Sequence, residues 1–346
     1  MPNYLQRTRE GRMTSIRKVS QVAGVSVATV SRTMRHPDRV RKETREKVLK
    51  AVEAVGYRPN MMARNFRAKK SFAVVVLVPN IANPFFSHVI RGIEQGAQQE
   101  GYAVLLGDTQ GLKEREAEYI SLVSSRQADG IIQLSANVDG VLEILDGADG
   151  PVPLVNACEC AVNPPCPTVR IDNVGAAKKA MEHLISLGHE RIGIVLGPGD
   201  SPLTVDRLHG YKLALQENKL PFDKRLVVSG DFSLGSGRRA VTSLSAVNNP
   251  PSAIFCCNDE MAIGAMHRVK TDGFRVPEDI SIIGFDDIEF ASYVDPALTT
   301  IAQPTEELGK VAFSVLLDLL EGRTPEQMEF VLPTELIVRD STGVRS

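Results

Sequence analysis

Polar and aromatic side chains follow several of the most apolar runs in this 346-residue chain. These groups are Asn83-Pro84-Phe85-Phe86, Asp108, Asp231-Phe232, Asn258-Asp259 and Asp286-Asp287. Aromatic rings stack on flat molecules, and carboxylates accept pairs of hydrogen bonds. If the apolar runs form neighbouring strands, the groups meet at one edge and suit a small planar or hydroxylated ligand. The alternative is that a carboxylate at a strand end caps the following helix, and Asp259 is the clearest candidate for capping.

No arrangement typical of an enzyme accompanies these residues. The sequence contains no P-loop and no G-x-S-x-G turn, and none of its six histidines pairs with a Ser or Cys nucleophile in a recognisable motif. Asp286 and Asp287 could still serve as acid and base. The five cysteines include no C-x-x-C pair. This favours reduced structural thiols over a metal site at Cys158, Cys160 and Cys166, and no cofactor is expected.

The charge of the chain is unevenly distributed. Residues 1–70 carry 18 Lys and Arg against 5 Asp and Glu, a net charge of +13. The whole chain has a net charge of −2, so residues 71–346 carry −15 (−2 − 13). A strongly basic segment is typical of a domain that binds nucleic acid, because each neutralised phosphate releases counterions. A helical bundle with a solvated basic face is the alternative.

The basic segment has the pattern of a helix-turn-helix. Apolar residues at helical spacing predict helices over 16–23, 27–34 and about 42–55. Gly24 permits the tight turn between the first two, because it adopts positive φ without steric cost, and Ser26 is placed to cap the second. The inward faces are expected to include Val22 of the first helix and Leu49 of the third. The outward face of the second helix is expected to carry Val27, Ala28, Ser31 and Arg32.

From residue 72 onward, continuous apolar runs alternate with amphipathic helices, a pattern typical of a parallel sheet covered on both faces. The expected strands are 72–80, 102–108, 129–135, 152–157, 191–197, 226–232, 253–259 and 280–287. The expected helices between them are 85–100, 113–127, 175–187, 207–218, 234–246 and 260–272. The alternation restarts near residue 175, which predicts two doubly wound α/β lobes. In such sheets ligands bind outside the carboxyl ends of the strands.

These patterns define the expected domain boundaries. The expected domains are a helix-turn-helix head at 14–59, a hinge segment at 60–70 and an α/β core at 71–341. The segment 298–304 should return the chain to the first lobe, before a helix at 306–321 and a final strand within FVLPTELIVRDS. The first lobe would then contain about 71–171 and 304–326, and the second about 172–301 and 327–341. No export signal or run of 18 apolar residues is found, so we expect a cytoplasmic protein.

Three segments of the head, AGVSVATVSR, TREKV and GYRPNMMAR, resemble the DNA-binding domain of the LacI/GalR family of bacterial repressors. The likeness continues to about residue 341. It implies an all-α helix-turn-helix head and a core like that of periplasmic binding proteins, with two doubly wound parallel-sheet lobes that bind an effector and dimerise. It also implies that Val27, Ala28 and Arg32 read bases. Arg32 can bond a guanine, whereas the other two offer only apolar contact.

The remaining expected DNA contacts lie around these base-reading residues and in the hinge. Hydroxyl and guanidinium groups that can contact phosphates are found at Ser15, Ser26, Thr29, Ser31, Thr44 and Arg45, although each hydroxyl could instead be a cap or simply solvated. The hinge is expected to contribute Asn60, Ala63, Arg64 and Phe66. Phe66 matches the apolar side chain that family members wedge into the minor groove. A flexible linker with one exposed Phe is the alternative.

The resemblance also marks effector-binding positions in the core. RLHGY and GFDD resemble segments whose arginine and first aspartate hold the effector, which marks Arg207 and Asp286. Aromatic positions around the base in purine-responsive members match Phe85, Phe86 and Phe232, and Ser201 stands where those members have an arginine. With Asp259 from its strand end, the expected effector-binding residues are Phe85, Phe86, Ser201, Arg207, Phe232, Asp259 and Asp286.

Segments VPNIANPFFSHVIRGIE, PTVRIDN, GPGDSPLTVDRLHGY and VPEDISIIGFDDIEF resemble family members that respond to a nucleoside. This likeness implies a nucleoside such as cytidine as inducer, and the cAMP receptor protein as a neighbour on the promoter. A purine or a sugar effector is the alternative. Paired heads that read the two half-sites of a two-fold operator imply a homodimer.

The sequence therefore predicts a ligand-responsive transcriptional repressor and not an enzyme. The less favoured alternative is an α/β ligand-binding protein or enzyme with a basic appendage. Effector in the cleft should favour one relative orientation of the lobes and, by linkage, change the affinity for operator DNA.

Overall fold

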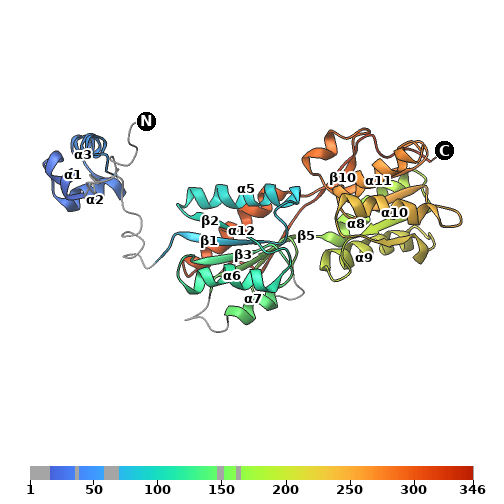
Figure 1. Cartoon of the computed structure of the whole chain (residues 1–346), viewed down its shortest axis with the longest axis horizontal. Coiled ribbons are helices and arrows are strands. Elements are labelled where there is room, and N and C mark those ends of the chain that lie inside the picture. Colours follow the sequence, from blue (N-terminus) through green and yellow to red (C-terminus); the bar gives the residue numbers. More distant parts are fainter. Residues whose placement is uncertain (1–15, 36–38, 58–69, 146–151, 161–164, 346) are drawn as a thin grey trace, which may run out of the picture. The chain divides into compact units, whose positions relative to one another are not determined.

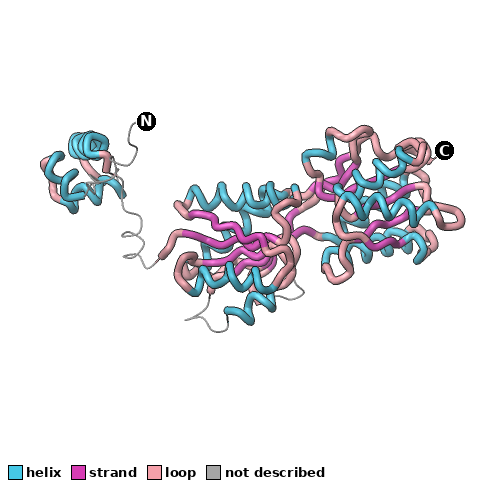
Figure 2. Tube along the Cα trace, in the orientation of Figure 1, coloured by secondary structure: helices cyan, strands magenta, loops and turns pink. Residues whose placement is uncertain are grey.

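The computed structural model describes residues 16–35, 39–57, 70–145, 152–160 and 165–345. The chain forms two compact units, Met1–Lys69 and Lys70–Ser346. Figures 1 and 2 show an all-helical first unit and a second unit in which helices and strands alternate. Among the described residues, every helix is too short or too polar to cross a membrane.

The described part of the first unit contains the three predicted helices. These are α1 (Ile16–Ala23), α2 (Val27–Arg35) and α3 (Lys42–Val55). Their core is built from the buried residues Val19, Val30, Val48 and Ala51. The expectation that Val22 and Leu49 face inward is wrong, since they are 56% and 48% exposed. A domain of this size covers only a narrow stripe of each helix, and both residues lie beside that stripe.

Local signals in the sequence fix the ends of these helices. Gly24 has φ of 64°, as the turn between α1 and α2 requires. The Ser26 hydroxyl oxygen accepts a hydrogen bond of 3.1 Å from the backbone N–H of Thr29, so Ser26 caps α2 as predicted. Gly56, also at φ of 64°, ends α3.

In the described part of the second unit, the first lobe is a parallel sheet of order β11-β5-β4-β3-β1-β2 with helices on both faces (Figure 1). Its strands are β1 (Ala73–Val78), β2 (Ala103–Asp108), β3 (Gly130–Gln133), β4 (Leu154–Ala157), β5 (Thr168–Ile171) and β11 (Glu329–Leu332). Its helices are α5 (Pro84–Gln99), α6 (Lys113–Ser124), α7 (Val138–Leu145) and α12 (Thr305–Leu320).

The second lobe repeats this architecture with the order β12-β10-β9-β8-β6-β7, in which only the edge strand β12 is antiparallel to its neighbour. Its strands are β6 (Ile192–Leu196), β7 (Val227–Ser229), β8 (Ala253–Cys256), β9 (Ser281–Asp286), β10 (Thr299–Ala302) and β12 (Glu335–Ile337). Its helices are α8 (Asn173–Ser186), α9 (Pro202–Glu217), α10 (Leu234–Ser245) and α11 (Asp259–Thr271), with short 3-10 turns η2 (Lys224–Leu226) and η3 (Glu289–Ser292).

All the predicted strands and helices of the core are present, but the C-terminal segment departs from the prediction. FVLPTELIVRDS forms two strands in different lobes, because Pro333 lacks the N–H that would continue a ladder. β11 pairs with β5, so residues 329–332 belong to the first lobe and not to the second as expected. β12 pairs with β10 in the second lobe. β5 and α7 were not among the predicted elements.

The chain passes between the two lobes at residues 171–173, 302–305 and 332–335. In the first lobe, α5 and α12 pack closely because glycines face each other. A Cβ at Gly92 would lie 2.0 Å from the Glu306 carbonyl oxygen, and one at Gly309 would lie 2.1 Å from the Val89 oxygen. This packing fixes α5, whose N-terminal end faces the second lobe.

Candidate functional site

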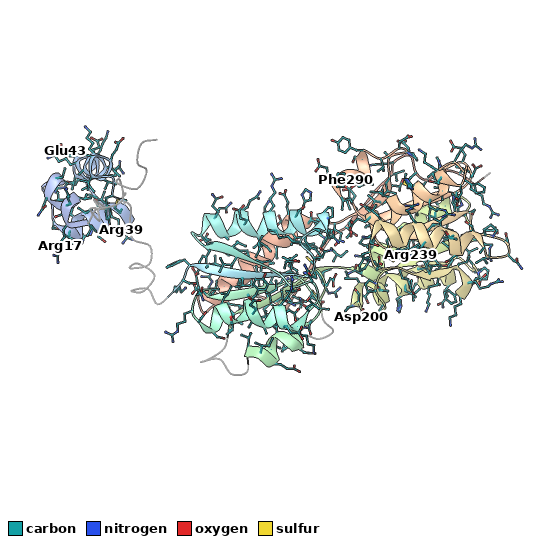
Figure 3. The ribbon with its side chains drawn as sticks, viewed as in Figure 1. Arg17, Arg39, Glu43, Asp200, Arg239 and Phe290 are labelled. Carbon is teal, nitrogen blue, oxygen red and sulfur yellow. The ribbon has the colours of Figure 1, made fainter. Side chains whose placement is uncertain are left out.

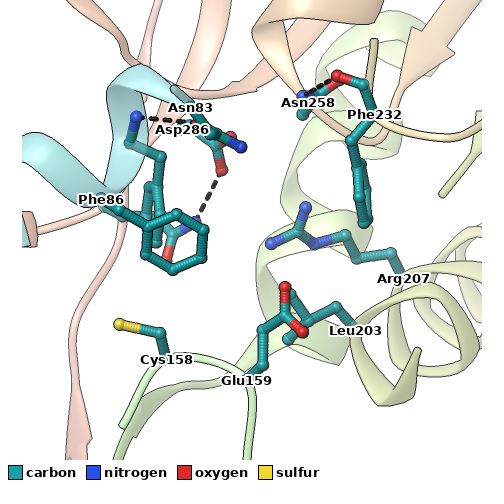
Figure 4. A pocket seen from close by; sticks show the side chains of 11 residues that line it. Asn83, Phe86, Cys158, Glu159, Leu203, Arg207, Phe232, Asn258 and Asp286 are labelled. Carbon is teal, nitrogen blue, oxygen red and sulfur yellow. Dashed lines mark hydrogen bonds between the residues drawn. The ribbon is translucent and has the colours of Figure 1, made fainter. Parts of the chain in front are cut away.

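A cavity with about 400 Å³ of empty space, partly open to solvent, lies where the strand ends of the two lobes meet (Figure 4). The first lobe contributes Asn83, Phe85, Phe86, Cys158 and Glu159 to its lining. The second lobe contributes Leu203, Arg207, Phe232, Asn258 and Asp286, and Gln303 lies on a segment that connects the lobes.

Arg207 of α9 is the cation of this cavity, and its side chain is only 2% exposed. Its Nε donates a hydrogen bond of 3.0 Å to Asn173 Oδ1, and its Nη1 donates to the carbonyl oxygen of Cys257. The guanidinium carbon lies 3.7 Å from the centre of the Phe285 ring. Arg207 is therefore held from behind by neutral groups, with its positive charge facing the cavity.

Two carboxyl groups face the same space. Asp286, at the end of β9, has φ of 114° and accepts a hydrogen bond of 2.7 Å from Gln303 Nε2. Glu159 follows β4, directly after Cys158, whose φ is 67°. Within the described part of the chain, Arg207 forms no ion pair with either carboxylate. Three groups that can carry charge thus line the cavity without neutralising one another by direct contact.

Burial raises the pKa of both carboxyl groups to about 7. Desolvation is the main cause in each case, because it penalises the charged form. The positive charge of Arg207 opposes the increase, and Asp286 and Asp200 add to it for Glu159. At neutral pH the charge of the cavity therefore responds to whatever occupies it.

Phe86 and Phe232 provide aromatic surfaces on two sides of the cavity (Figure 4). The Phe85 and Phe86 rings are 5.2 Å apart in an edge-on arrangement. Phe232 has φ of 63°, and its carbonyl oxygen accepts a hydrogen bond of 3.0 Å from Asn258 Nδ2. A Cβ at Gly197 would lie 2.0 Å from Phe232 Cζ, so this ring keeps its place only because residue 197 is glycine.

The structure brings five of the seven predicted effector-binding residues into the lining, namely Phe85, Phe86, Arg207, Phe232 and Asp286. Ser201 is not among them. Because α9 begins at Pro202 and not at residue 207, Ser201 becomes its N-cap residue, and its buried Oγ has no hydrogen-bond partner among the described residues.

Asp259 also lies outside the lining and is fully buried. Its carboxylate accepts a hydrogen bond of 2.6 Å from Thr300 Oγ1 and one of 2.9 Å from the Ile288 N–H, so it ties β10 to the loop after β9. Nor does it cap a helix, because Asn258 caps α11 by accepting from the Met261 N–H. The strand-end pattern therefore predicted the correct edge of the sheet. Of the pair Asn258-Asp259, however, Asn258 lines the cavity and Asp259 does not.

Two further lining residues, Asn83 and Asn258, belong to the strand-end groups named from the sequence, although no effector-binding role was predicted for them. Four lining residues were not predicted at all, namely Cys158, Glu159, Leu203 and Gln303. Cys158 and Glu159 directly follow the strand predicted at 152–157, so the strand-end pattern extends to them. Leu203 was hidden by the late start predicted for its helix, and Gln303 by the absence of any local signal on its crossing segment.

In the first unit, the residues expected to read DNA lie on the outer face of α2. Val27 is 40% exposed, and Ala28 and Arg32 are exposed, whereas Val30 is buried. Ser26 and Thr29 hydrogen-bond to each other in the cap of α2, and Ser31, Thr44 and Arg45 are partly exposed. Ser15, Asn60, Ala63, Arg64 and Phe66 lie outside the described residues.

The cysteines of the core are all free thiols. Cys158, Cys166, Cys256 and Cys257 are buried, and Cys160 is partly buried. Burial raises the pKa of the Cys160 thiol to about 12 and that of Cys166 to about 11. Among the described residues, no group of three His, Cys, Asp or Glu side chains is placed to hold a metal ion.

Comparison with known proteins agrees with both units. Residues 15–60 match the family described as bacterial regulatory proteins, lacI family, and residues 181–342 match the periplasmic binding protein-like domain. The HTH-type transcriptional repressor CytR of Escherichia coli (strain K12) is 41% identical over 328 residues, which cover 95% of this chain and 96% of that protein. The HTH-type transcriptional repressor PurR of Vibrio atlanticus (strain LGP32) is 33% identical over 329 residues, covering 95% and 98%.

The solved structure of the lac repressor dimer bound to operator and the anti-inducer ONPF has the same fold. It is 28% identical, covers 95% of this chain and 99% of that chain, and gives a TM-score of 0.83. These relatives are repressors and not enzymes, so the alternative of an enzyme with a basic appendage is rejected. The chain belongs to the LacI family of bacterial regulatory proteins, and it is a transcriptional repressor with a helix-turn-helix DNA-binding domain and an effector-binding core.

Proposed function

We propose that the effector is a nucleoside such as cytidine, and that it acts as an inducer by weakening operator binding. One observation carries this proposal. Arg207 and Asp286 face the cavity without an ion pair between them, and Phe86 and Phe232 supply rings beside them. A ligand with vicinal hydroxyls and a flat ring would satisfy both kinds of group at once.

The ribose hydroxyls would donate to the Asp286 carboxylate and accept from Arg207. Gln303 already donates to one oxygen of Asp286, which holds the carboxylate in place. The base would lie against Phe86 and Phe232, where stacking on an aromatic ring favours flat molecules. A sugar would use the polar groups but leave the rings uncovered. A purine held by an arginine at position 201 is disfavoured, because that residue is Ser201.

The proposed mechanism is a population shift. Three short segments connect the lobes, so the lobes can adopt more than one relative orientation. A ligand that contacts both lobes stabilises the orientation to which it binds more tightly. DNA would be bound through Val27, Ala28 and Arg32 at base edges, and through Ser26, Thr29, Ser31, Thr44 and Arg45 at phosphates. The hinge residues Asn60, Ala63, Arg64 and Phe66 would add minor-groove contacts. The resemblance of the core segments to nucleoside-responsive family members supports the cAMP receptor protein as the neighbour on the promoter.

The repressor would act as a homodimer, and two exposed apolar areas suit a second copy of the chain. On the second lobe, Phe290 (Figure 3) is 57% exposed and Tyr293 is 80% exposed. Both lie in the same chain segment as Val294, which lines a surface hollow. On the first lobe, Ile81, Leu106 and Leu112 are exposed at or near the edge strand β2. Exposed apolar side chains that form a contiguous patch are typical of association surfaces.

Sedimentation equilibrium tests the dimer surface. Tyr293→Asp should weaken dimerisation at least about tenfold, because an interface that buries an unpaired carboxylate loses several kcal/mol. Phe274→Asp, at an exposed phenylalanine on a different segment from residues 290–294, is the control and should leave the dimer intact. If Tyr293→Asp also leaves the dimer unchanged, this part of the surface is not the interface.

Calorimetric titration tests the effector. The wild-type protein is titrated with cytidine, hypoxanthine and ribose, each with and without bound operator duplex. Cytidine should bind more tightly than hypoxanthine or ribose, and bound operator should weaken cytidine binding, because linkage is reciprocal. Absence of cytidine binding would reject the nucleoside proposal, and tighter binding in the presence of operator would make the ligand a corepressor.

A further inference from the structure

Glu159 is the one charged side chain that the first lobe contributes to the described lining of the cavity. Its position depends on the chain reversal after β4, where Cys158 adopts φ of 67°, and on a hydrogen bond of 3.3 Å from Asn156 Nδ2 to the Glu159 carbonyl oxygen. Asn156 is itself fully buried and also donates to the carbonyl oxygens of Gln133 and Ser135. The backbone of Glu159 is therefore fixed to the sheet.

The carboxyl group of Glu159 makes no hydrogen bond and no ion pair within the part of the chain that the structure describes. In this it differs from Asp286, which is held by Gln303. In Figure 4 the Glu159 and Asp286 carboxyl groups enter the cavity from opposite sides, with Arg207 beside them. If Asp286 holds the ribose, Glu159 lies on the opposite side of the cavity, where the base would be.

We propose that Glu159 reads the base of the effector, by binding a base edge that carries a hydrogen-bond donor next to an acceptor. This inference rests on the proposed nucleoside effector and assigns a specificity-determining residue to the same site. A neutral carboxylic acid presents one O–H donor beside one acceptor oxygen. The edge of cytosine presents the complementary pair, a ring nitrogen that accepts and an amino group that donates.

The surroundings of Glu159 make the neutral acid available at neutral pH. Burial raises its pKa to about 7, Asp286 and Asp200 act in the same direction, and Arg207 opposes them. The Cys158 thiol beside it stays protonated, since burial raises its pKa well above the ordinary value. An ionised carboxylate would offer only acceptors and would face the lone pair of the ring nitrogen. Binding of cytidine should therefore favour the protonated form of Glu159.

The test compares cytidine with pyrimidin-2-one riboside, which keeps the ribose and the ring but lacks the amino group. Calorimetry is carried out on the full-length wild-type protein, Glu159→Gln and Glu159→Met. Wild type should bind cytidine at least tenfold more tightly than the analogue. Glu159→Gln should keep this preference, because an amide also offers a donor and an acceptor. Glu159→Met should lose it while still binding both ligands through the ribose contacts.

The pH dependence of cytidine affinity is a second measurement, and a purely structural role of Glu159 would not change it. Above pH 7, wild-type affinity for cytidine should fall by up to about tenfold per pH unit, as the acid form of Glu159 is lost. Glu159→Gln should abolish this decrease. Burial raises the pKa of Asp286 to about 7, against the opposing effects of Arg207 and the Gln303 hydrogen bond and with a smaller contribution from Glu260. Because Asp286 accepts hydroxyls as a carboxylate, its protonation should weaken binding below pH 7 in both proteins.

The outcomes separate the two proposals. If wild type binds neither nucleoside, the nucleoside effector and the role of Glu159 are both rejected. If wild type prefers cytidine and Glu159→Met prefers it equally, with the same pH dependence, the nucleoside proposal stands and Glu159 does not read the base. Operator binding of each variant in the absence of ligand is the control for folding.

Discussion

The helix α2 and the effector cavity differ in how they present polar groups to a ligand: α2 presents exposed groups from one helix, and the cavity presents buried groups from distant elements. On α2 the expected contacts come from one helix and are exposed to water, as Val27 and Arg32 illustrate. In the cavity, Arg207 and Asp286 come from elements about eighty residues apart and are only 2% and 8% exposed. The helix presents its groups before any partner arrives, whereas the cavity exists only once both lobes have folded.

This difference has an energetic consequence. Charges in water interact weakly and are screened by salt. The affinity of the head for DNA should therefore depend on how many basic groups contact phosphates and not on any single one. Buried charges interact strongly but are costly when unpaired. The shifted pKa values of Asp286 and Glu159 reflect that cost. Loss of one buried group should therefore have a larger effect than loss of one exposed group.

Asp286→Ala should give the largest effect. Removal of one member of a buried, hydrogen-bonded set of charges costs about 2–5 kcal/mol of ligand binding, so the response of operator binding to cytidine should disappear. Operator affinity without ligand should stay at the wild-type level. The measurements are calorimetry with cytidine and an operator-binding titration with and without cytidine. Retention of the full response would exclude Asp286 from the site and remove the contrast with the head.

The same contrast explains which features were predictable from sequence. The three helices of the head were predicted, because a turn glycine, a cap and an apolar stripe lie within a few residues of one another. Among the described residues of the head, only the predicted burial of Val22 and Leu49 was wrong, because the sequence does not show how far burial extends around each helix. In the core, continuous apolar strands were also visible, since a buried parallel strand needs no partner residue to be recognised.

The cavity was only partly predictable, because its residues are brought together by pairing of distant strands. Arg207 and Asp286 were found through their motifs. Gln303 lies on a segment whose course depends on β10 pairing with β9. Glu159 follows a strand end that was predicted correctly, but no motif distinguished it from a solvated carboxylate. Asp259 was misassigned because its partner Thr300 is far away in the sequence. No local pattern distinguishes a carboxylate that faces a ligand from one that faces a threonine.

Arg32→Ala tests the exposed side of the comparison and should have an intermediate effect. A bidentate contact to guanine contributes about 1–3 kcal/mol of discrimination, and its loss should weaken operator binding by that amount and random-DNA binding much less. Arg17→Ala removes the same charge from an exposed position on α1 (Figure 3) and is the matched control. Fluorescence anisotropy at several salt concentrations measures both. Equal losses for operator and random DNA with Arg32→Ala would show that Arg32 contacts only phosphate.

Gly197→Ala should give the smallest effect. It tests whether ligand binding in the cavity depends on close packing, which the exposed helix α2 does not need. In Gly197→Ala the new Cβ would lie 2.0 Å from Phe232 Cζ, so the ring must move away from the base. The expected loss is about 0.5–1.5 kcal/mol of nucleoside binding, the magnitude of one aromatic contact, with operator affinity unchanged. Gly199→Ala is the control, because no atom lies within 4 Å of its added methyl group. If both variants bind cytidine like wild type, Phe232 does not stack on the base, and recognition of the effector must depend on the polar groups alone.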